Sequence, residues 1–238
     1  MPPSKKQYWI VHGGKLSIKN VHSFLSKSYD KNLSDNGDYL VDHDLSDGKV
    51  QVYKHQANNH AVVVHRGTDS LRDWLTNAKY ALGLHKHDAR FRHSIDIQQR
   101  AENKYGAENI STLGHSLGSA LAREAGKNSK EVIGYNGAET IADTSANSSK
   151  NTMIRTKYDP VSIHGRNAEN VLTIPEGDSS SLISRLAKNG LRKSVLGLVD
   201  AHKTDHLKSL PQDLMVGADD FVADTGGVVL GGKLHRWK

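Results

Sequence analysis

The sequence predicts an α/β fold in which a mostly parallel central sheet carries helices on its faces. Two observations predict it. Short β-prone runs alternate with stretches of helical periodicity through the middle of the 238-residue chain, and a glycine-rich turn joins one such run directly to a helix. The length fits one domain, because single α/β domains commonly contain roughly 200–250 residues.

The first expected strands are Val50–Lys54 and Ala61–His65, and the turn-forming pair Asn58-Asn59 lies between them. A helix is expected over Phe91–Tyr105, because residues on one face recur at spacings of three and four. Gly106 follows where a helix C-terminus would be capped, so this helix has an expected end as well as a period.

The next expected strand, Ile110–Leu113, leads through the glycine-rich turn into a helix over Leu117–Ala125. Three further β-prone runs continue the alternation: Val132–Tyr135, Met153–Thr156 and Asn170–Ile174. Strands that alternate with helices favour parallel pairing, since a crossover helix returns the chain to the same edge of the sheet.

These elements suggest a division of the chain into three parts. We expect residues 50–210 to form the domain core, residues 1–49 to be an extension packed on it, and residues 211–238 to be a tail. Its last part, Phe221–Lys238, contains four glycines and a basic end, which predict no regular fold of its own.

Composition excludes several classes of function. The chain has no cysteine, which excludes disulfides, thiolate metal ligands and a cysteine nucleophile. Its formal net charge is +6, but the charges are interspersed rather than clustered, so we expect no nucleic-acid partner. No apolar run approaches the roughly 18 residues of a membrane span, and the N-terminus lacks a signal-peptide pattern; a cytoplasmic or virion-associated location is therefore expected.

The glycine-rich turn carries the clearest chemical signal. Gly114-His115-Ser116-Leu117-Gly118 has the Gly-x-Ser-x-Gly pattern, and it stands between an expected strand and an expected helix. That context is the one a nucleophile elbow requires, because the serine must sit on a sharp turn with its hydroxyl projecting from the sheet. Ser116 is the expected nucleophile, and the Leu117 N–H at the helix start is an expected donor to the oxyanion.

A serine needs a histidine base oriented by a carboxylate, and on this elbow the chain order is serine, acid, histidine. Asp159 is the expected acid, because it directly follows an expected strand and precedes a proline. Asp143 and Asp178 lie in serine-rich loops and are weaker alternatives.

Four histidines follow the acid in the chain. We favour His206 as the base because Leu207 and Leu210 can anchor its segment, and His202 is its alternative. His164 is too close to Asp159 in sequence, and His235 lies in the tail.

Two blocks of sequence resemble the class 3, fungal-type lipases of the α/β-hydrolase superfamily. The first runs from Val62 to Asn77 and is similar to the family's apolar strand, Arg-Gly-Thr turn and Asp-Trp-x-x-Asn segment. The second, from Ile110 to Ala122, is similar to the family elbow, with Ser119 in place of the second glycine of the usual pair.

The resemblance implies an α/β-hydrolase fold and a role for each matching residue. Ser116, Asp159 and His206 would form a catalytic triad, and Thr68 would supply an oxyanion-hole N–H beside that of Leu117. Ser70–Leu84 corresponds to the family's lid, with a fixed, packed segment as the alternative.

The resemblance also implies the hydrolysis of acyl esters, without a metal or organic cofactor. Lipid esters such as acylglycerols or phospholipids are the expected substrates; a small-ester esterase and a non-catalytic or particle-associated protein with this fold are the alternatives. Separately, Ser181–Val199 carries four cations and apolar residues, a composition that suggests peripheral contact with an anionic membrane surface.

Overall fold

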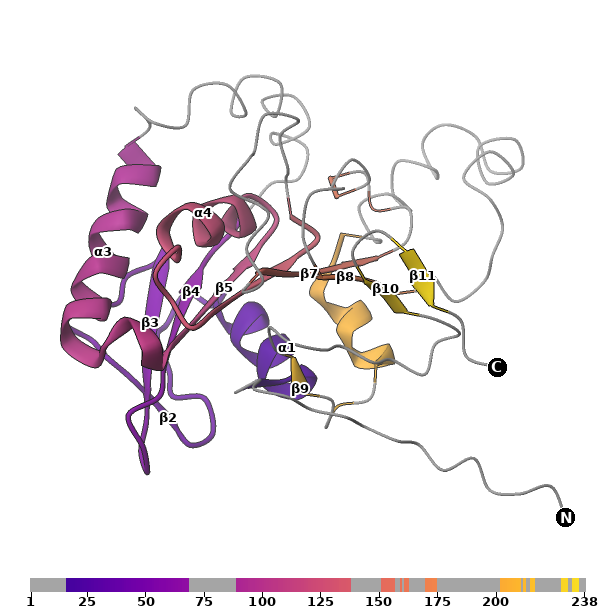
Figure 1. Cartoon of the computed structure of the whole chain (residues 1–238). Helices are drawn as coiled ribbons and strands as arrows, with labels where there is room; N and C mark the ends of the chain where they lie inside the picture. Colours follow the sequence, from indigo (N-terminus) through magenta and orange to yellow (C-terminus); the bar gives the residue numbers. More distant parts are fainter. Residues whose placement is uncertain are drawn as a thin grey trace, which may run out of the picture.

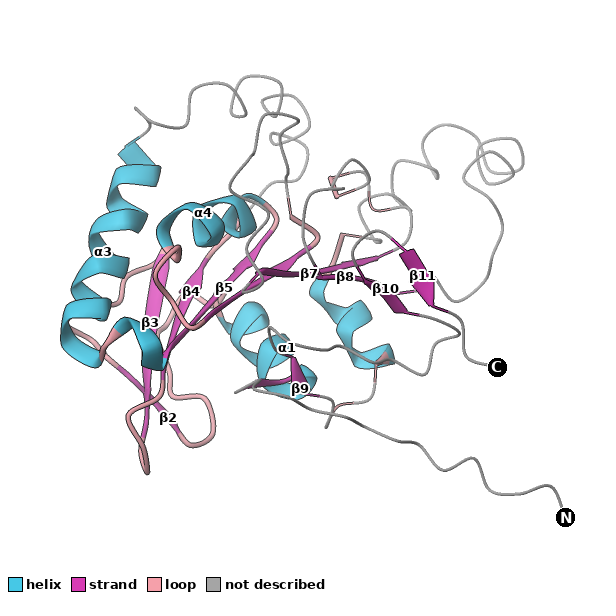
Figure 2. Cartoon of the chain, viewed as in Figure 1, coloured by secondary structure: helices cyan, strands magenta, loops and turns pink. Residues whose placement is uncertain are grey.

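The computed structural model describes residues 16–68, 89–137, 151–156, 159, 161–162, 170–174, 202–210, 212, 215–216, 228–230 and 233–235. A nine-stranded sheet with the order β11-β10-β8-β7-β6-β5-β4-β3-β2 forms its centre (Figures 1 and 2). In chain order its strands are β2 (Tyr39–Val41), β3 (Val50–His55), β4 (Ala61–His65), β5 (Ile110–His115), β6 (Glu131–Tyr135), β7 (Asn151–Thr156), β8 (Asn170–Ile174), β10 (Val228–Leu230) and β11 (Lys233–His235).

The middle of this sheet is parallel and its two margins are antiparallel. The strands β4, β5, β6, β7 and β8 pair in parallel, each with the next. At one margin β2 and β3 are antiparallel to their neighbours, and at the other margin β10 and β11 are. This mostly parallel sheet with flanking helices confirms the expected fold class, and the carboxyl ends of the five parallel strands share one edge.

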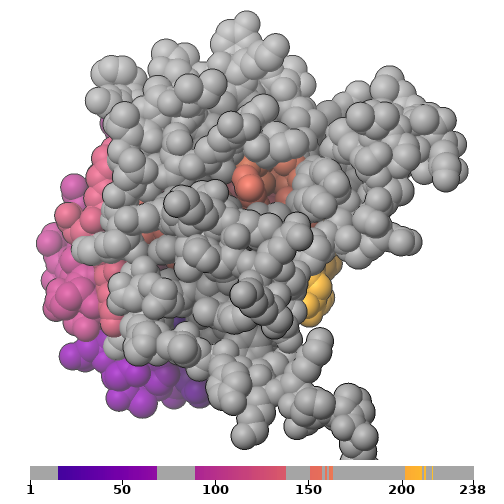
Figure 3. Space-filling model, turned by 45° about the vertical axis from the view of Figure 1, so that its right-hand side comes forward, coloured from indigo at the N-terminus to yellow at the C-terminus, as the bar shows by residue number. Residues whose placement is uncertain are grey.

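Helices cover both faces of the sheet (Figure 1). The described helices are α1 (Ile18–Lys27), α3 (Ala89–Tyr105) and α4 (Leu117–Ala125), with the 3-10 helices η2 (Ala107–Asn109) and η4 (Thr204–Ser209). The helices α3 and α4 pack together on one face, whereas α1 packs with η4 on the other. Figure 3 accordingly shows α3 in magenta and η4 in orange on opposite sides of the view.

Alternation along β4 divides the core between these two faces. Val62 and Val64 join the larger apolar cluster, which includes Phe24 of α1 and Leu207 of η4. Val63, which points the other way, joins a second cluster with residues of α3. A strand buried on both faces reads as a continuous apolar run, which is the pattern that predicted this strand.

Each of the strands and helices expected between residues 50 and 174 is present, with ends shifted by at most two residues. At the turn between β3 and β4 the Asn58 side chain accepts a hydrogen bond from the His60 N–H at 2.8 Å. After α3, Gly106 adopts φ +83°, a conformation that favours glycine.

Segments outside the expected core take part in the fold. The helix α1 begins with a capping box in which Ser17 and Asn20 exchange side-chain and backbone hydrogen bonds, and four of its residues are buried. The short strand β1 (Leu16–Ser17) pairs with β9 (Met215–Val216), which lies beyond residue 210. The division at residues 49 and 210 thus stays a prediction, and strands from all three parts contribute to the sheets.

Candidate active site

Ser116 occupies a strained turn between β5 and α4. Its φ of 58° and ψ of −126° lie in a region that non-glycine residues rarely adopt, and it is 2% exposed. The glycines on either side are required by close approach. A Cβ on Gly114 would overlap the carbonyl of Gly118, and a Cβ on Gly118 would overlap the carbonyl of His65. The sterics expected of a nucleophile elbow are therefore present.

The departure of Ser119 from the family pattern has a local explanation. Its buried hydroxyl faces two glycines, because a Cβ on either Gly134 or Gly137 would overlap the Ser119 Oγ. Gly134 and Gly137 have no side chains, and this leaves room for the Ser119 hydroxyl. The helix α4 therefore keeps its close packing on β6 although position 119 is not a glycine.

Asp159 is buried at the carboxyl end of the sheet, just beyond β7, and pairs with His202. The Asp159 Oδ1 lies 2.7 Å from the His202 Nδ1, and its Oδ2 accepts a hydrogen bond from the Ser162 N–H at 2.8 Å. Asp159 is 0% and His202 6% exposed. A neutral imidazole that donates from Nδ1 carries its lone pair on Nε2, which is the arrangement a general base requires.

The sequence favoured His206 for this pairing, and the structure places His202 there instead. Leu207 and Leu210 are buried as expected, 0% and 2% exposed, and they lie one turn apart on the core side of η4. His206 is one residue away from that face and is only half-buried. Anchoring by the leucines therefore positions η4, whereas the residue that reaches Asp159 stands before the helix begins.

His115, the residue before Ser116, holds the backbone of His202. Its Nε2 donates to the His202 carbonyl at 2.8 Å, and the two rings lie 4.7 Å apart at 35°. Burial lowers the pKa of His115 to about 3, so the ring is neutral and, because its Nε2 donates, its Nδ1 can only accept. The Tyr29 hydroxyl, 2.6 Å away, is therefore the donor to that Nδ1. Sequence reasoning missed both residues, although His115 lies inside the motif.

The turn after β4 lies directly against the elbow. A Cβ on Gly67 would come within 3.1 Å of the Ser116 Cβ and within 2.7 Å of the His115 carbonyl, so only glycine fits. Thr68 follows and is half-buried, and Leu117 is the first residue of α4. Both expected oxyanion donors are thus one or two residues from the contact between this turn and the elbow.

Comparison with known proteins identifies the family to which the chain belongs. A family model described as a Tle-like phospholipase domain, of the phospholipase-like type, matches residues 22–172. The chain belongs to this family. It is a carboxylic ester hydrolase of the lipase and phospholipase type, as the resemblance to class 3 lipases led us to expect. The match begins inside α1, so the family region includes part of the segment expected to be an extension.

Solved structures similar to this chain are fungal lipases and a triacylglycerol lipase. A mutant form of MDLA from Penicillium cyclopium shares 16% identity over 69% of this chain and 79% of that one, with a TM-score of 0.47. A triacylglycerol lipase described as having a serine protease triad shares 12% over 66% and 78%, with a TM-score of 0.49. Rhizomucor miehei lipase in its propeptide complex shares 11% over 69% and 72%, with a TM-score of 0.43. No curated protein sequence matched the chain.

Several sequence predictions lie outside the described residues: the alternative acids Asp143 and Asp178, the lid segment Ser70–Leu84, and the basic segment Ser181–Val199. Of the two histidines that the sequence set aside as bases, His164 also lies outside these residues and His235 is part of β11. Within the described ranges no helix is long and apolar enough to cross a membrane. The same ranges contain no group of three or more His, Asp or Glu side chains arranged to hold a metal ion.

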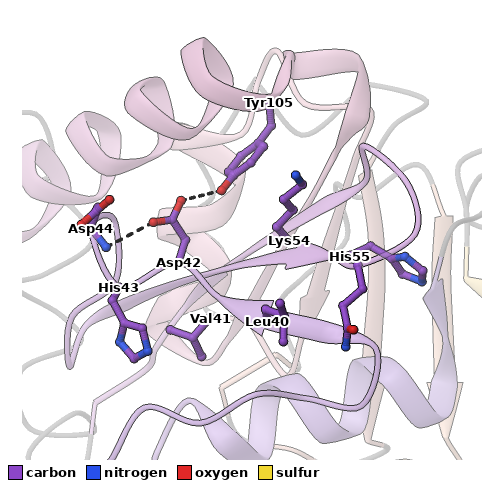
Figure 4. Close-up of a pocket in the computed structure, with 9 residues that line it drawn as sticks. Leu40, Val41, Asp42, His43, Asp44, Lys54, His55 and Tyr105 are labelled. Carbon is purple, nitrogen blue, oxygen red and sulfur yellow. Dashed lines mark hydrogen bonds between the residues drawn. The ribbon is translucent and has the colours of Figure 1, made fainter.

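A pocket of about 590 Å³ lies away from the elbow, beside β2 at the margin of the sheet (Figure 4). Asp42 on its wall accepts hydrogen bonds from the Tyr105 hydroxyl at 2.5 Å and the Asp44 N–H at 3.2 Å. Lys104 also contacts the Asp42 carboxylate at 2.7 Å. Because the protein's own donors occupy this carboxylate, the pocket has the character of a structural junction between β2 and α3.

Proposed function

We propose that this Tle-like phospholipase hydrolyses carboxylic esters of lipids with Ser116 as nucleophile, His202 as general base and Asp159 as the acid that orients the base. One observation carries the proposal: the Asp159–His202 pair, at 2.7 Å, is tied through the His202 carbonyl to His115, the residue that precedes the strained serine. His202 replaces His206, the base favoured from the sequence.

The proposed reaction uses this arrangement in two steps. The Ser116 Oγ attacks the ester carbonyl while its proton passes to the His202 Nε2, and the N–H groups of Leu117 and Thr68 receive the charge that develops on the carbonyl oxygen. Collapse expels the alcohol, which takes the proton from His202. Water, deprotonated by the same base, then releases the acyl group from the serine.

Phospholipids are the proposed substrate class, because the family model is that of a phospholipase domain. Acylglycerols and small esters are the alternatives that the sequence left open. Contact of Ser181–Val199 with an anionic membrane surface, the lid and the cytoplasmic or virion-associated location stay predictions from the sequence alone.

A fluorophosphonate probe tests the chemistry, and vesicles test the substrate. We expect the probe to label wild type on the peptide that contains Ser116 and to leave Ser116→Ala unlabelled, and we expect phosphatidylcholine–phosphatidylglycerol vesicles to release fatty acid. Absence of labelling in folded wild type would favour the non-catalytic alternative. Labelling with hydrolysis of p-nitrophenyl butyrate but of no lipid would favour the small-ester esterase.

A further inference from the structure

Arg90, the second residue of α3, holds the turn that carries Thr68. Its Nη2 donates to the Gly67 carbonyl at 3.0 Å and also bonds the Arg66 carbonyl. Arg90 is far from the elbow in sequence, and no catalytic motif includes it. Two backbone carbonyls that share one guanidinium nitrogen form a charge-assisted contact, which is stronger and more directional than a bond between neutral groups.

The other backbone groups of the turn also have partners. The Arg66 N–H donates to the Lys49 carbonyl at 3.0 Å, and the Arg66 side chain bonds the Gly48 carbonyl at 3.0 Å. The Tyr29 hydroxyl, which donates to His115, lies directly against Gly67. The Arg66 backbone and the Gly67 carbonyl are therefore held by hydrogen bonds, and the turn is packed against Tyr29.

The Gly67 carbonyl and the Thr68 N–H belong to the same peptide group. In a trans peptide these two groups point to opposite sides, and the described residues contain no cis peptide. Because Arg90 binds the Gly67 carbonyl, the Thr68 N–H must point away from Arg90. From this geometry we propose that Arg90 is a positioning residue of the oxyanion hole, which orients the Thr68 N–H toward the ester oxygen. The inference rests on the proposed function, since it assumes that Ser116 forms a tetrahedral intermediate.

The guanidinium also acts on the donor through the peptide bond. A cation at the carbonyl oxygen polarises the peptide and strengthens its N–H as a donor, because hydrogen bonds in a chain reinforce one another. The benefit is greatest when the ester oxygen becomes negative. Loss of Arg90 is therefore expected to lower kcat and to leave KM for a soluble ester near its wild-type value.

The test compares Arg90→Gln with Arg92→Gln, an exposed arginine on the same helix. With p-nitrophenyl butyrate we expect kcat of Arg90→Gln to fall about 10- to 100-fold, less than the roughly 10²–10³-fold loss that follows removal of a donor. We expect KM to change less than about twofold. Phosphonylation of Ser116 should slow by a factor similar to that of kcat. Arg90→Lys, which keeps the cation but not the planar fork, should retain an intermediate kcat.

A folded Arg90→Gln protein with the kcat of Arg92→Gln would overturn the inference, as would a loss expressed in KM alone. If Arg90→Gln does not fold, Arg90→Lys takes its place, and an unchanged kcat in that variant would overturn the inference in the same way. Failure of the proposed function gives a different result, because wild type itself would then neither react with the phosphonate at Ser116 nor hydrolyse the ester.

Discussion

The two edges of the parallel sheet each carry a buried network of tyrosine, histidine, serine and carboxylate. At the carboxyl edge Tyr29 bonds His115, the neighbour of Ser116, and His115 bonds the backbone of His202, whose ring pairs with Asp159. At the amino edge the network consists of Tyr39, His60, Ser111 and Glu131. The two sets contain nearly the same residue types, yet only the first contains the residues that we propose for catalysis.

The order of the hydrogen bonds separates the two networks. Ser111 donates its hydroxyl proton to Glu131. The His60 Nε2, 2.8 Å from the same hydroxyl, therefore contacts the hydroxyl oxygen and cannot accept its proton. In the other network the carboxylate bonds the histidine instead. The backbone differs as well: Ser111 lies within regular β5, whereas Ser116 has a positive φ at the start of α4. A serine becomes a nucleophile through its position in the network and through its turn, and residue composition alone does not indicate this.

Replacing each of the two serines by alanine in turn tests this distinction, and it has the largest expected effect on kcat. Ser116→Ala should lower kcat by about 10⁶-fold, because losing a triad nucleophile commonly costs that much. Ser111→Ala should retain most of the wild-type kcat and lose stability only. Ester hydrolysis and thermal unfolding of both variants give the answer, and a folded Ser116→Ala protein with wild-type turnover would contradict the mechanism.

The histidines near η4 sharpen the assignment of the base. His202→Ala should lower kcat by about 10⁴–10⁶-fold, since the proton of Ser116 then has no acceptor. His206→Ala, the matched control, should change kcat less than about threefold, because its ring lies off the core face of η4. The reverse ranking in folded proteins would return the role to His206.

The two carboxylates provide the third comparison. Asp159→Asn should lower kcat by about 10⁴-fold, because an amide neither fixes the required tautomer nor stabilises the imidazolium. Glu131→Gln preserves shape at the amino edge and should leave kcat within about threefold of wild type, since Glu131 contacts Ser111 and not the elbow. Equal activities of the two variants would show that Asp159 does not orient the base.

Substitutions of Tyr29 and Tyr39 test whether the hydrogen bond to His115 helps to position His202. Tyr29→Phe removes the donor to His115 and should lower kcat about 3- to 10-fold, the equivalent of one ordinary hydrogen bond. Tyr39→Phe removes the same kind of bond to His60 and should reduce only stability. Kinetics and urea unfolding should be measured on both, and equal kcat values would remove Tyr29 from the site.

A final comparison concerns two buried histidines and the dependence of stability on pH. Burial lowers the pKa of His115 to about 3 and that of His65, at the end of β4, to about 4. Both values lie below the unfolded value of 6.5, so the unfolded state binds more protons as the pH falls. The free energy of unfolding should therefore have its highest value above pH 6.5 and should decrease progressively between about pH 6.5 and 3.

Urea unfolding at several pH values measures this decrease, and His65→Gln should show a shallower dependence than wild type. His65 is fully buried and bonds Gln98 at 3.3 Å, so the variant replaces a titratable ring by an amide that can keep the contact. A stability that is constant from pH 7 to 4.5 would mean that neither histidine is held neutral.

Local physics made the centre of this protein predictable from its sequence. The strands and helices between residues 50 and 174 follow from hydrophobic period and from glycine at helix ends. The elbow follows from sterics within five consecutive residues, because Gly114 and Gly118 are required wherever a serine adopts this turn. Asp159 followed from its place just after a strand, since the carboxyl ends of parallel strands meet at one edge.

Only the tertiary structure placed His202 opposite Asp159 and joined Tyr29 and Arg90 to the site. These contacts involve the turn after α1, the start of α3 and the segment before η4, which are far apart in sequence, and each depends on how an element packs rather than on its period. The leucines of η4 predicted that the helix is anchored, but two histidines four residues apart differ in direction, which only the packed backbone decides. Sequence alone thus determined the strained serine turn, whereas tertiary packing decided which histidine pairs with Asp159 and which side chains support the turn.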